Sequence, residues 1–318
     1  VADAVCYTRD LVNRPGNFVT PGVMAEEAEA LALEYDMEFE ILDVTMMEAM
    51  GMHALLAVGQ GSIHPPCLIT IKYNGAGDAP YTAYVGKGIT FDSGGISIKP
   101  SDNMGEMKDD MAGAGAVLGA LRAIAALKVP CNIMGIIACA ENMPSGSAQR
   151  PGDVVKAANG KTIEVFSTDA EGRMVLADAV WYACRQGAAK VVDIATLTGG
   201  VIVALGTETA GIVGNDDTLI RQLIEAGKKA GEGYWQLPSL PECREALKSD
   251  VADLLNSVGR EASCISGGLF IGEFVEAGIP WAHIDIGGTS TAAKTAGFKV
   301  KGGTGFGVST LIKLAQEM

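Results

Sequence analysis

The sequence predicts an α/β fold with a central, mostly parallel mixed sheet sandwiched between helices. Along the whole chain, short β-branched runs alternate with longer segments of helical pattern, which is typical of this class. Two of the runs, residues 132–140 and 191–197, are apolar on both faces, as expected of strands that helices cover on each side. Because neither an internal repeat nor a Pro/Ser-rich linker divides the chain, we expect residues 1–318 to form one compact domain.

The order of the elements follows from the same patterns. The chain opens inside a segment of helical pattern, ADAVCYTRDLVNRPG, and starts with Val1 rather than Met, so we expect further residues upstream. Thr20 followed by Pro21 is an N-cap and N1 pair that marks the start of a helix. The predicted helices are 21–35, 109–127, 172–186, 217–230, 267–277 and 305–316. The predicted strands are 68–73, 81–85, 132–140, 191–197, 211–214 and 282–286.

Composition narrows the class of protein. Hydrophobic residues make up 48% of the chain and charged residues 19%, which excludes a disordered or fibrous protein. A net charge of −14 disfavours non-specific binding to nucleic acid or anionic lipid. The apolar stretches are too short to span a membrane or carry a charge such as Asp193, and no signal segment opens the chain. Seven cysteines without a CxxC pair predict reduced, buried thiols of a cytoplasmic protein.

Ionisable residues gather in two segments, of which the first is VGKGITFDSGGISIKPSDNMGEMKDDM at 85–111. Lys87, Asp92 and Lys99 lie in its glycine-rich strand-to-loop part, and Asp109 and Asp110 stand where the next helix is predicted to begin. Ligand sites of open α/β sheets gather at the carboxyl ends of the strands. We therefore expect this segment to contribute to a site.

The second segment is STDAEGR at 167–173, directly before a predicted helix. Asp169, Glu171 and Arg173 are spaced i, i+2, i+4, and on an extended backbone this spacing directs all three side chains to one face. Two acids held side by side raise each other's pKa and destabilise the site unless a cation compensates them.

If the two segments meet, they form an acidic cluster that two divalent cations would neutralise. Its four carboxylates are Asp92, Asp110, Asp169 and Glu171. Oxygen-rich ligands suit Zn²⁺, Mn²⁺, Mg²⁺ or Co²⁺, and such a site activates a bridging water and polarises a carbonyl or phosphoryl group. Lys99 and Arg173 would then serve as electrophile and anion clamp. Taken singly, acids such as Asp109 and Asp169 are also explained as helix caps and surface ion pairs.

Motifs of other enzyme classes are missing from the sequence. It contains neither a GxSxG elbow nor a GxxxxGK[ST] loop. The run AGAGAVLGALRA has the spacing G-x-G-x-x-x-G, which favours close helix packing over dinucleotide binding. The three histidines, His53, His64 and His283, form no HExxH motif. His283 in WAHIDIGG is predicted to be a buried strand residue, with pocket lining as the alternative.

Several blocks of the sequence together resemble the leucine (cytosol) aminopeptidases, a family of di-metal exopeptidases. These blocks are VGKGITFDSGGISIKPS, MKDDM, ENMPSGSAQRPGDV, STDAEGRMVLADA and DIATLTGG. The likeness runs in register from about Arg9 to the C-terminus. It implies removal of N-terminal residues from peptides by a cytoplasmic enzyme.

The resemblance also implies the metal ligands. Asp92 and Glu171 would bridge two metal ions, Zn or Mn in the first place, with Co or Mg possible. Asp110 would bind the more tightly held ion and Asp169 the more exchangeable one. Lys87 would be a ligand through a neutral amine, which requires a strongly depressed pKa.

The remaining roles implied by the resemblance concern the reaction and the substrate. Lys99 would polarise the scissile carbonyl, and Arg173 would hold a bicarbonate ion as general base. The free α-amine of the substrate would coordinate a metal ion, which restricts cleavage to the N-terminus. The expected substrate-binding residues are Met107, Thr196, Leu197 and Gly199, with Met107 shaping an apolar pocket for Leu-like side chains.

The sequence departs from the family pattern in three respects. Ser167 stands where the family usually has Asn, and the helix opens DMAGAG rather than DMGGA. Family members carry a separate α/β domain ahead of the catalytic one and assemble as hexamers, so this chain is expected to be the catalytic domain without the N-terminal one.

Two other functions are alternatives to peptide hydrolysis. One is two-metal phosphoester hydrolysis. The other is a regulatory role, because some bacterial relatives bind DNA, but the net charge of −14 disfavours it.

Overall fold

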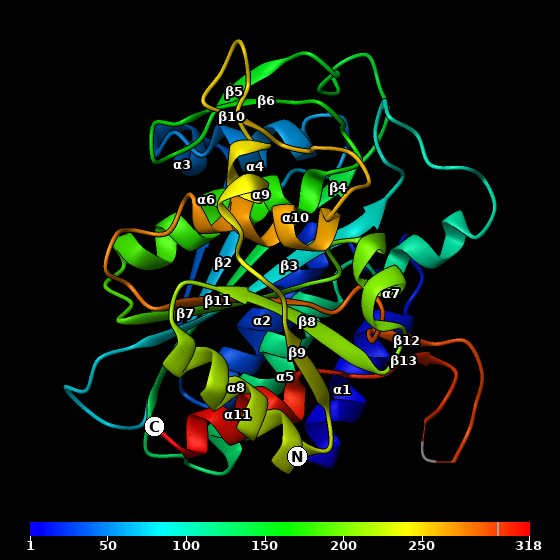
Figure 1. Ribbon diagram of the computed structural model, residues 1–318. Coiled ribbons are helices and arrows are strands. Elements are labelled where there is room, and N and C mark those ends of the chain that lie inside the picture. Colours follow the sequence, from blue (N-terminus) through cyan, green and yellow to red (C-terminus); the bar gives the residue numbers. More distant parts are fainter. Residues whose placement is uncertain (298) are drawn as a thin grey trace.

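A large mixed sheet organises the chain, whose computed structural model describes residues 1–297 and 299–318. Within these residues eight strands pair in the order β1-β2-β4-β3-β7-β11-β8-β9 (Figure 1). They are β1 (Glu38–Leu42), β2 (Cys67–Asn74), β3 (Thr82–Asp92), β4 (Asn132–Asn142), β7 (Lys190–Ala195), β8 (Thr209–Gly214), β9 (Gly233–Gln236) and β11 (Trp281–Asp285). The four central strands β4, β3, β7 and β11 are parallel, whereas β2 runs antiparallel to β4 and β8 antiparallel to β11. The predicted fold class is confirmed.

Helices cover both faces of this sheet, as Figure 1 shows. One layer contains α1 (Ala2–Asn13), α2 (Pro21–Glu34), α5 (Ala112–Ala126), α8 (Asp217–Ala230) and α11 (Val308–Gln316). The other contains α3 (Val44–Ala49), α4 (His53–Gly59), α6 (Glu171–Arg185) and α10 (Ser263–Gly272), with the short α7 (Gly199–Leu205) and α9 (Pro241–Glu245) near its margin. Because alternate strand residues point to opposite faces, neighbours such as Tyr84 and Val85 belong to two separate buried clusters, one for each layer.

A smaller sheet lies beside the second helix layer. Its strands, in the order β10-β6-β5, are β10 (Leu254–Leu255), β6 (Thr162–Glu164) and β5 (Val154–Lys156). A further two-stranded pair joins β12 (Thr291–Ala292) and β13 (Gly302–Gly303). The small sheet matters for the site because β6 leads directly into the segment 167–173.

The six predicted strands are all present, and three of the predicted helices are shifted. The helix expected at 109–127 is α5, which begins at Ala112, because Asp109 is the last residue of the 3₁₀ helix η1 (Met104–Asp109). The helix expected at 267–277 spans Ser263–Gly272, so it begins four residues earlier than predicted and Gly267 lies inside it. The helix expected at 305–316 begins at Val308, because Gly305 and Gly307 have positive φ angles of 69° and 93°.

Other expectations concern cysteines and membranes. Among the described residues all seven cysteines are free; five are buried, whereas Cys6 is exposed and Cys243 partly so. Burial of every thiol was therefore an incorrect prediction. In the described part of the chain, the helices are all too short or too polar to cross a lipid bilayer.

Candidate metal centre

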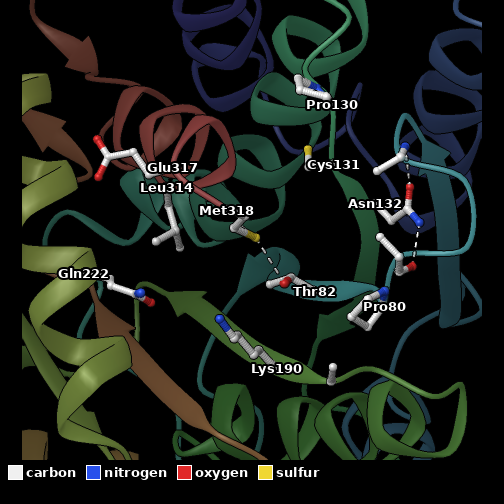
Figure 2. A pocket seen from close by; sticks show the side chains of 13 residues that line it. Pro80, Thr82, Pro130, Cys131, Asn132, Lys190, Gln222, Leu314, Glu317 and Met318 are labelled. Atoms are coloured by element: carbon white, nitrogen blue, oxygen red, sulfur yellow. Dashed lines mark hydrogen bonds between the residues drawn. The ribbon is translucent and has the colours of Figure 1, made fainter.

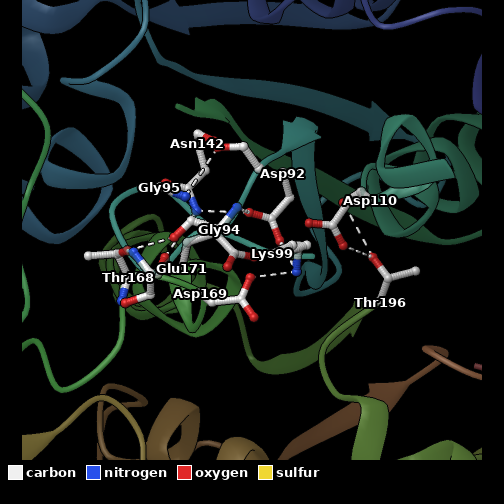
Figure 3. Close-up of polar contacts among 12 residues, drawn as sticks. Asp92, Gly94, Gly95, Lys99, Asp110, Asn142, Thr168, Asp169, Glu171 and Thr196 are labelled. Carbon is white, nitrogen blue, oxygen red and sulfur yellow. Dashed lines mark hydrogen bonds and ion pairs between the residues drawn. The ribbon is translucent and has the colours of Figure 1, made fainter. Parts of the chain in front are cut away.

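The two ionisable segments meet at the carboxyl end of the parallel strands (Figure 3). Lys87 and Asp92 lie on β3, and Asp92 is the last residue of that strand. Asp110 follows η1, Asp169 lies in the turn before α6, and Glu171 is the first residue of α6. The expected encounter of sequence-distant acids is therefore observed.

Lys87 forms the buried side of the cluster, with only 2% of its surface exposed. Its Nζ lies 2.8 Å from Asp110 Oδ1 and 2.8 Å from Glu171 Oε1, and it donates a hydrogen bond to the carbonyl oxygen of Thr196 at 2.8 Å. A Cβ atom on Gly172 would lie 2.7 Å from Lys87 Nζ, so glycine at this position leaves room for the lysine. Burial lowers the pKa of Lys87, but the adjacent carboxylates raise it by more, and the net shift is upward.

Lys99 forms the more open side of the cluster. Its Nζ lies 2.7 Å from Asp92 Oδ2 and 2.5 Å from Asp169 Oδ1, and Figure 3 shows it between the two acids. Its side chain retains 22% of its exposure, in contrast to the enclosed Lys87. This lysine can therefore reach a molecule that approaches from solvent.

Three of the four carboxylic acids in the cluster have raised pKa values. Burial and the neighbouring Glu171 raise the pKa of Asp92 to about 6. Burial raises the pKa of Asp110 well above its usual range, although Lys87 opposes the shift. Burial and Glu171 also raise the pKa of Asp169. Only Glu171 is shifted downward, because Lys87 and Lys99 outweigh the effect of burial on its pKa.

The donor set fits divalent cations. Asp92, Asp169 and Glu171 each offer a carboxylate oxygen, and these three oxygens lie within 4.8 Å of one another. Two buried oxygens, Asp110 Oδ2 and Glu171 Oε2, accept no hydrogen bond from any described residue. A buried carboxylate oxygen without a partner is unfavourable, and a hard cation with oxygen ligands would satisfy it.

Two buried residues that the sequence reasoning missed hold the acidic segments together. Asn142 Nδ2 donates to Asp92 Oδ1 at 2.8 Å and to the carbonyl oxygen of Thr168 at 3.0 Å. Thr168 Oγ1 donates to Gly94 O at 2.6 Å and accepts from the N–H of Ser97 at 2.8 Å. Both residues stand inside the blocks that carry the family resemblance, which was the available signal. They fix the loop after β3 against the turn that carries Asp169.

The predicted extended geometry of Asp169, Glu171 and Arg173 is wrong. Only Asp169 precedes α6, whereas Glu171 and Arg173 belong to its first turn, where i and i+2 residues do not share a face. Arg173 is buried instead and its Nη1 donates to the carbonyl oxygen of Asn256 at 2.9 Å. Burial lowers the pKa of Arg173 to about 10, and its Nε has no hydrogen-bond partner among the described residues.

Of the four expected substrate-binding residues, Thr196 is the one with a hydrogen bond to this cluster among the described contacts. Thr196 Oγ1 donates to Asp110 Oδ1 at 2.7 Å, so Thr196 contacts an expected ligand directly. The N–H of Leu197 donates to Asp285 Oδ1 at 3.2 Å, and Gly199 is exposed at the start of α7. Met107 lies half-buried in η1.

His283 is completely buried, with Nδ1 2.5 Å from Asp193 Oδ1. This agrees with the prediction of a buried strand histidine.

A cavity of about 310 Å³ lies elsewhere in the molecule (Figure 2). Thr82, Asn132 and Lys190, which begin β3, β4 and β7, contribute to its lining together with Leu314 and other residues near the C-terminus. It therefore opens at the amino ends of the strands, opposite the acidic cluster, and none of the predicted site residues lines it.

Comparisons with known proteins agree with the geometry. The family described as "Cytosol aminopeptidase family, catalytic domain" matches residues 6–312. The "Probable cytosol aminopeptidase" of Alkaliphilus metalliredigens is 50% identical over the whole chain, and that of Alkaliphilus oremlandii is 51% identical. The chain spans 64% of the length of each of these two relatives. The solved structure "Bottromycin maturation enzyme BotP in complex with Mn" superposes with a TM-score of 0.96 at 41% identity, covering 99% of this chain and 70% of that one.

Proposed function

The chain belongs to the cytosol aminopeptidase family, and from this premise we propose that it is the catalytic domain of a metal-dependent aminopeptidase that removes N-terminal residues from peptides. The observation that carries the proposal is the convergence of four acids and two lysines at one end of the sheet, with buried carboxylate oxygens left without partners. In the complete protein we expect a separate domain ahead of this one, a cytoplasmic location and assembly into hexamers.

The proposed ligands are the residues whose carboxylates converge. Asp92 and Glu171 would bind both cations, Asp110 the tightly held one and Asp169 the exchangeable one. Lys87 would be a neutral amine ligand, which requires that the two cations depress its pKa, because without them the adjacent carboxylates raise it. When bound, two divalent cations supply a nucleophilic water at neutral pH and polarise a carbonyl group. The related BotP structure is described as a complex with Mn, which supports Mn²⁺ as a first candidate beside Zn²⁺, Co²⁺ and Mg²⁺.

Lys99 is proposed to act on the substrate carbonyl. Its ammonium group lies between Asp92 and Asp169 and is the more accessible of the two lysines in the cluster. Burial lowers its pKa, but Asp92 and Glu171 raise it by more, so Lys99 is positively charged at neutral pH. A charged donor held at the edge of the site can stabilise the oxyanion that forms when the carbonyl is attacked.

Arg173 is proposed to hold bicarbonate, which would supply a general base. Its guanidinium group is buried and its Nε lacks a partner among the described residues, so a donor is free for a small oxyanion.

The substrate is proposed to be a peptide with a Leu-like apolar N-terminal side chain. Met107, Thr196, Leu197 and Gly199 would bind it, with Met107 providing apolar contact.

The experiment that tests the function is hydrolysis of leucine p-nitroanilide by the purified chain, with bis(p-nitrophenyl) phosphate as the comparator. We expect hydrolysis of the anilide alone, loss of that activity with a chelator and its return with Mn²⁺, Co²⁺ or Zn²⁺. Activity that persists in chelator would contradict the metal dependence. Hydrolysis of the phosphodiester alone would instead indicate phosphoester chemistry.

A further inference from the structure

Asn256 lies outside the acidic cluster but is placed beside it by the small sheet. It directly follows β10, which pairs in parallel with β6, and its N–H donates to the carbonyl oxygen of Glu164 at 3.0 Å. Its exposed fraction is 0%. The pairing of β10 with β6 thereby places Asn256 next to the turn that leads into α6, although it lies about 85 positions further along the chain.

The side chain of Asn256 is occupied by this turn. Its Oδ1 accepts from the N–H groups of Phe166 at 2.8 Å and Ser167 at 3.2 Å. Its Nδ2 donates to the carbonyl oxygen of Ser167 at 2.7 Å. These contacts hold both polar groups of the Ser167 backbone, and Ser167 Oγ in turn accepts from the N–H of Asp169 at 3.2 Å. The side chain of Asn256 thus holds the backbone that precedes Asp169.

The same residue also holds Arg173. Its carbonyl oxygen accepts from Arg173 Nη1 at 2.9 Å, one helical turn beyond Asp169. Asn256 therefore contacts both the backbone that supports Asp169 and the side chain of Arg173, two residues that stand four positions apart in the chain. The carboxylate of Asp169 itself contacts Lys99, whereas its backbone is held through Ser167 and Thr168: Asn256 fixes Ser167, and Asn142 and Ser97 fix Thr168.

We propose that Asn256 is a positioning residue whose side chain sets Asp169 for the reaction, while its backbone carbonyl holds Arg173, without contacting substrate or metal. The inference rests on the proposed function, because Asp169 is the expected ligand of the more exchangeable cation. Some residues hydrogen-bond to metal ligands and orient them without binding the metal, and replacing them lowers metal affinity by about 10–100-fold. The effect should be selective for one ion, since the hydrogen bonds of the Asn256 side chain go to residues 166–174 and not to Asp110 or Lys87.

The test compares Asn256→Ala with a matched control, Asn132→Ala. Asn132 is also buried and also fixes a loop through its side chain, which accepts from Ala76 N–H at 2.9 Å and donates to the carbonyl oxygens of Gly77 and Ala79. It stands at the start of β4, at the opposite end of the sheet from the cluster. Loss of stability alone would affect both variants, whereas a positioning role concerns only Asn256.

Binding of Mn²⁺ to the full chain is measured by titration calorimetry, alongside thermal unfolding of each variant. We expect Asn256→Ala to bind the first Mn²⁺ as the wild type does and the second about tenfold more weakly. Asn132→Ala should bind both ions with wild-type affinity. Unchanged binding of both ions by Asn256→Ala, or an equal loss in both variants, would overturn the role of Asn256.

Two further outcomes are distinguishable. If Asn256→Ala does not fold, Asn256→Asp decides, because it is nearly isosteric and keeps the two accepted hydrogen bonds while losing the donated one. Its added negative charge would attract a cation, so weaker binding of the second Mn²⁺ would support the proposal, and unweakened binding would overturn it. A wild-type chain that binds no Mn²⁺ would remove the proposed function and this inference together, whereas unweakened binding in the variants removes only the inference.

Discussion

Replacing Glu171 with Gln should separate metal binding from folding. Glu171 is buried, its Oε1 lies 2.8 Å from Lys87 Nζ, and its Oε2 has no partner among the described residues. The amide keeps the size of the side chain but removes its negative charge. The proposed ligand shared by both cations is thereby lost.

The stability of the metal-free protein should change little. Losing the charged contact to Lys87 costs about 1.5–3 kcal/mol. However, the cluster has four carboxylates and two lysines, an excess of two negative charges. Removing Glu171 relieves the repulsion that, in addition to burial, raises the pKa of Asp92 and Asp110. The two effects oppose each other, so we expect a near-wild-type unfolding temperature without metal.

The stabilisation by metal should fall sharply. Replacing a residue that only supports a metal ligand lowers metal affinity by up to about 100-fold. If losing Glu171 lowers the affinity for Mn²⁺ by the same factor, the loss of binding free energy is about 2.7 kcal/mol. At a concentration 100 times the wild-type Kd, Mn²⁺ stabilises the wild type by about 2.7 kcal/mol but the variant by only about 0.4 kcal/mol. The difference corresponds to about 4–5 °C in the Mn²⁺-induced rise of the unfolding temperature, taking about 2 °C per kcal/mol for a large domain.

The assay is thermal unfolding with and without Mn²⁺, with Asp178→Asn as the matched control. Asp178 is also a buried acid on α6, but it accepts from the N–H groups of Leu55 and Ala158 and lies outside the acidic cluster. This control should unfold at a lower temperature without metal and retain the full wild-type rise with Mn²⁺. A wild-type rise in Glu171→Gln would refute the assignment of Glu171 as a ligand.

Two other predictions concern catalysis and pH. Lys99→Met should lower kcat for leucine p-nitroanilide by about 10²–10³-fold, as expected on loss of an oxyanion donor, while elemental analysis shows unchanged metal content; a kcat within a few-fold of the wild type would contradict this role. Burial raises the pKa of Asp178 from 3.8 to about 7, against the backbone N–H groups that lower it. The folded state then holds this proton more tightly than the unfolded state, so the contribution of Asp178 to stability is full below pH 4 and is lost as the pH rises to 7. Chemical unfolding of wild type and Asp178→Asn across this interval should show that the wild type loses more stability; parallel pH profiles would contradict the shift.

The sequence predicted the central sheet well because its strands are buried on both faces. Runs such as 132–140 are recognisable from composition alone, because every position after Asn132 is apolar. By contrast, β1 is an edge strand with exposed charged residues, and its sequence EFEIL carries little of that signal. The short helices α3, α4 and α7 were likewise missed, since each has seven residues or fewer and too few turns for a periodic pattern.

The acidic cluster was predictable because its members stand in two short segments. Residue type and spacing do not report the local backbone, however, and Arg173 was placed on an extended face that α6 does not provide. Asn142 and Asn256 escaped notice for another reason. Their role lies in hydrogen bonds to segments 26 and 89 residues away, which no residue spacing encodes, and only Asn142 stands in a block that carries the family resemblance.

The charge excess in the cluster explains why such supports are needed. Repulsion among the carboxylates favours any local rearrangement that separates them, and it adds to the larger effect of burial in raising the pKa of Asp92 and Asp110. Asn142 and Thr168 oppose it through hydrogen bonds to the backbone on both sides of the cluster. A cation that meets ligands already held together avoids the ordering penalty of about 0.5–1.5 kcal/mol for each side chain. Metal affinity should therefore depend on these neutral supports as well as on the number of acids.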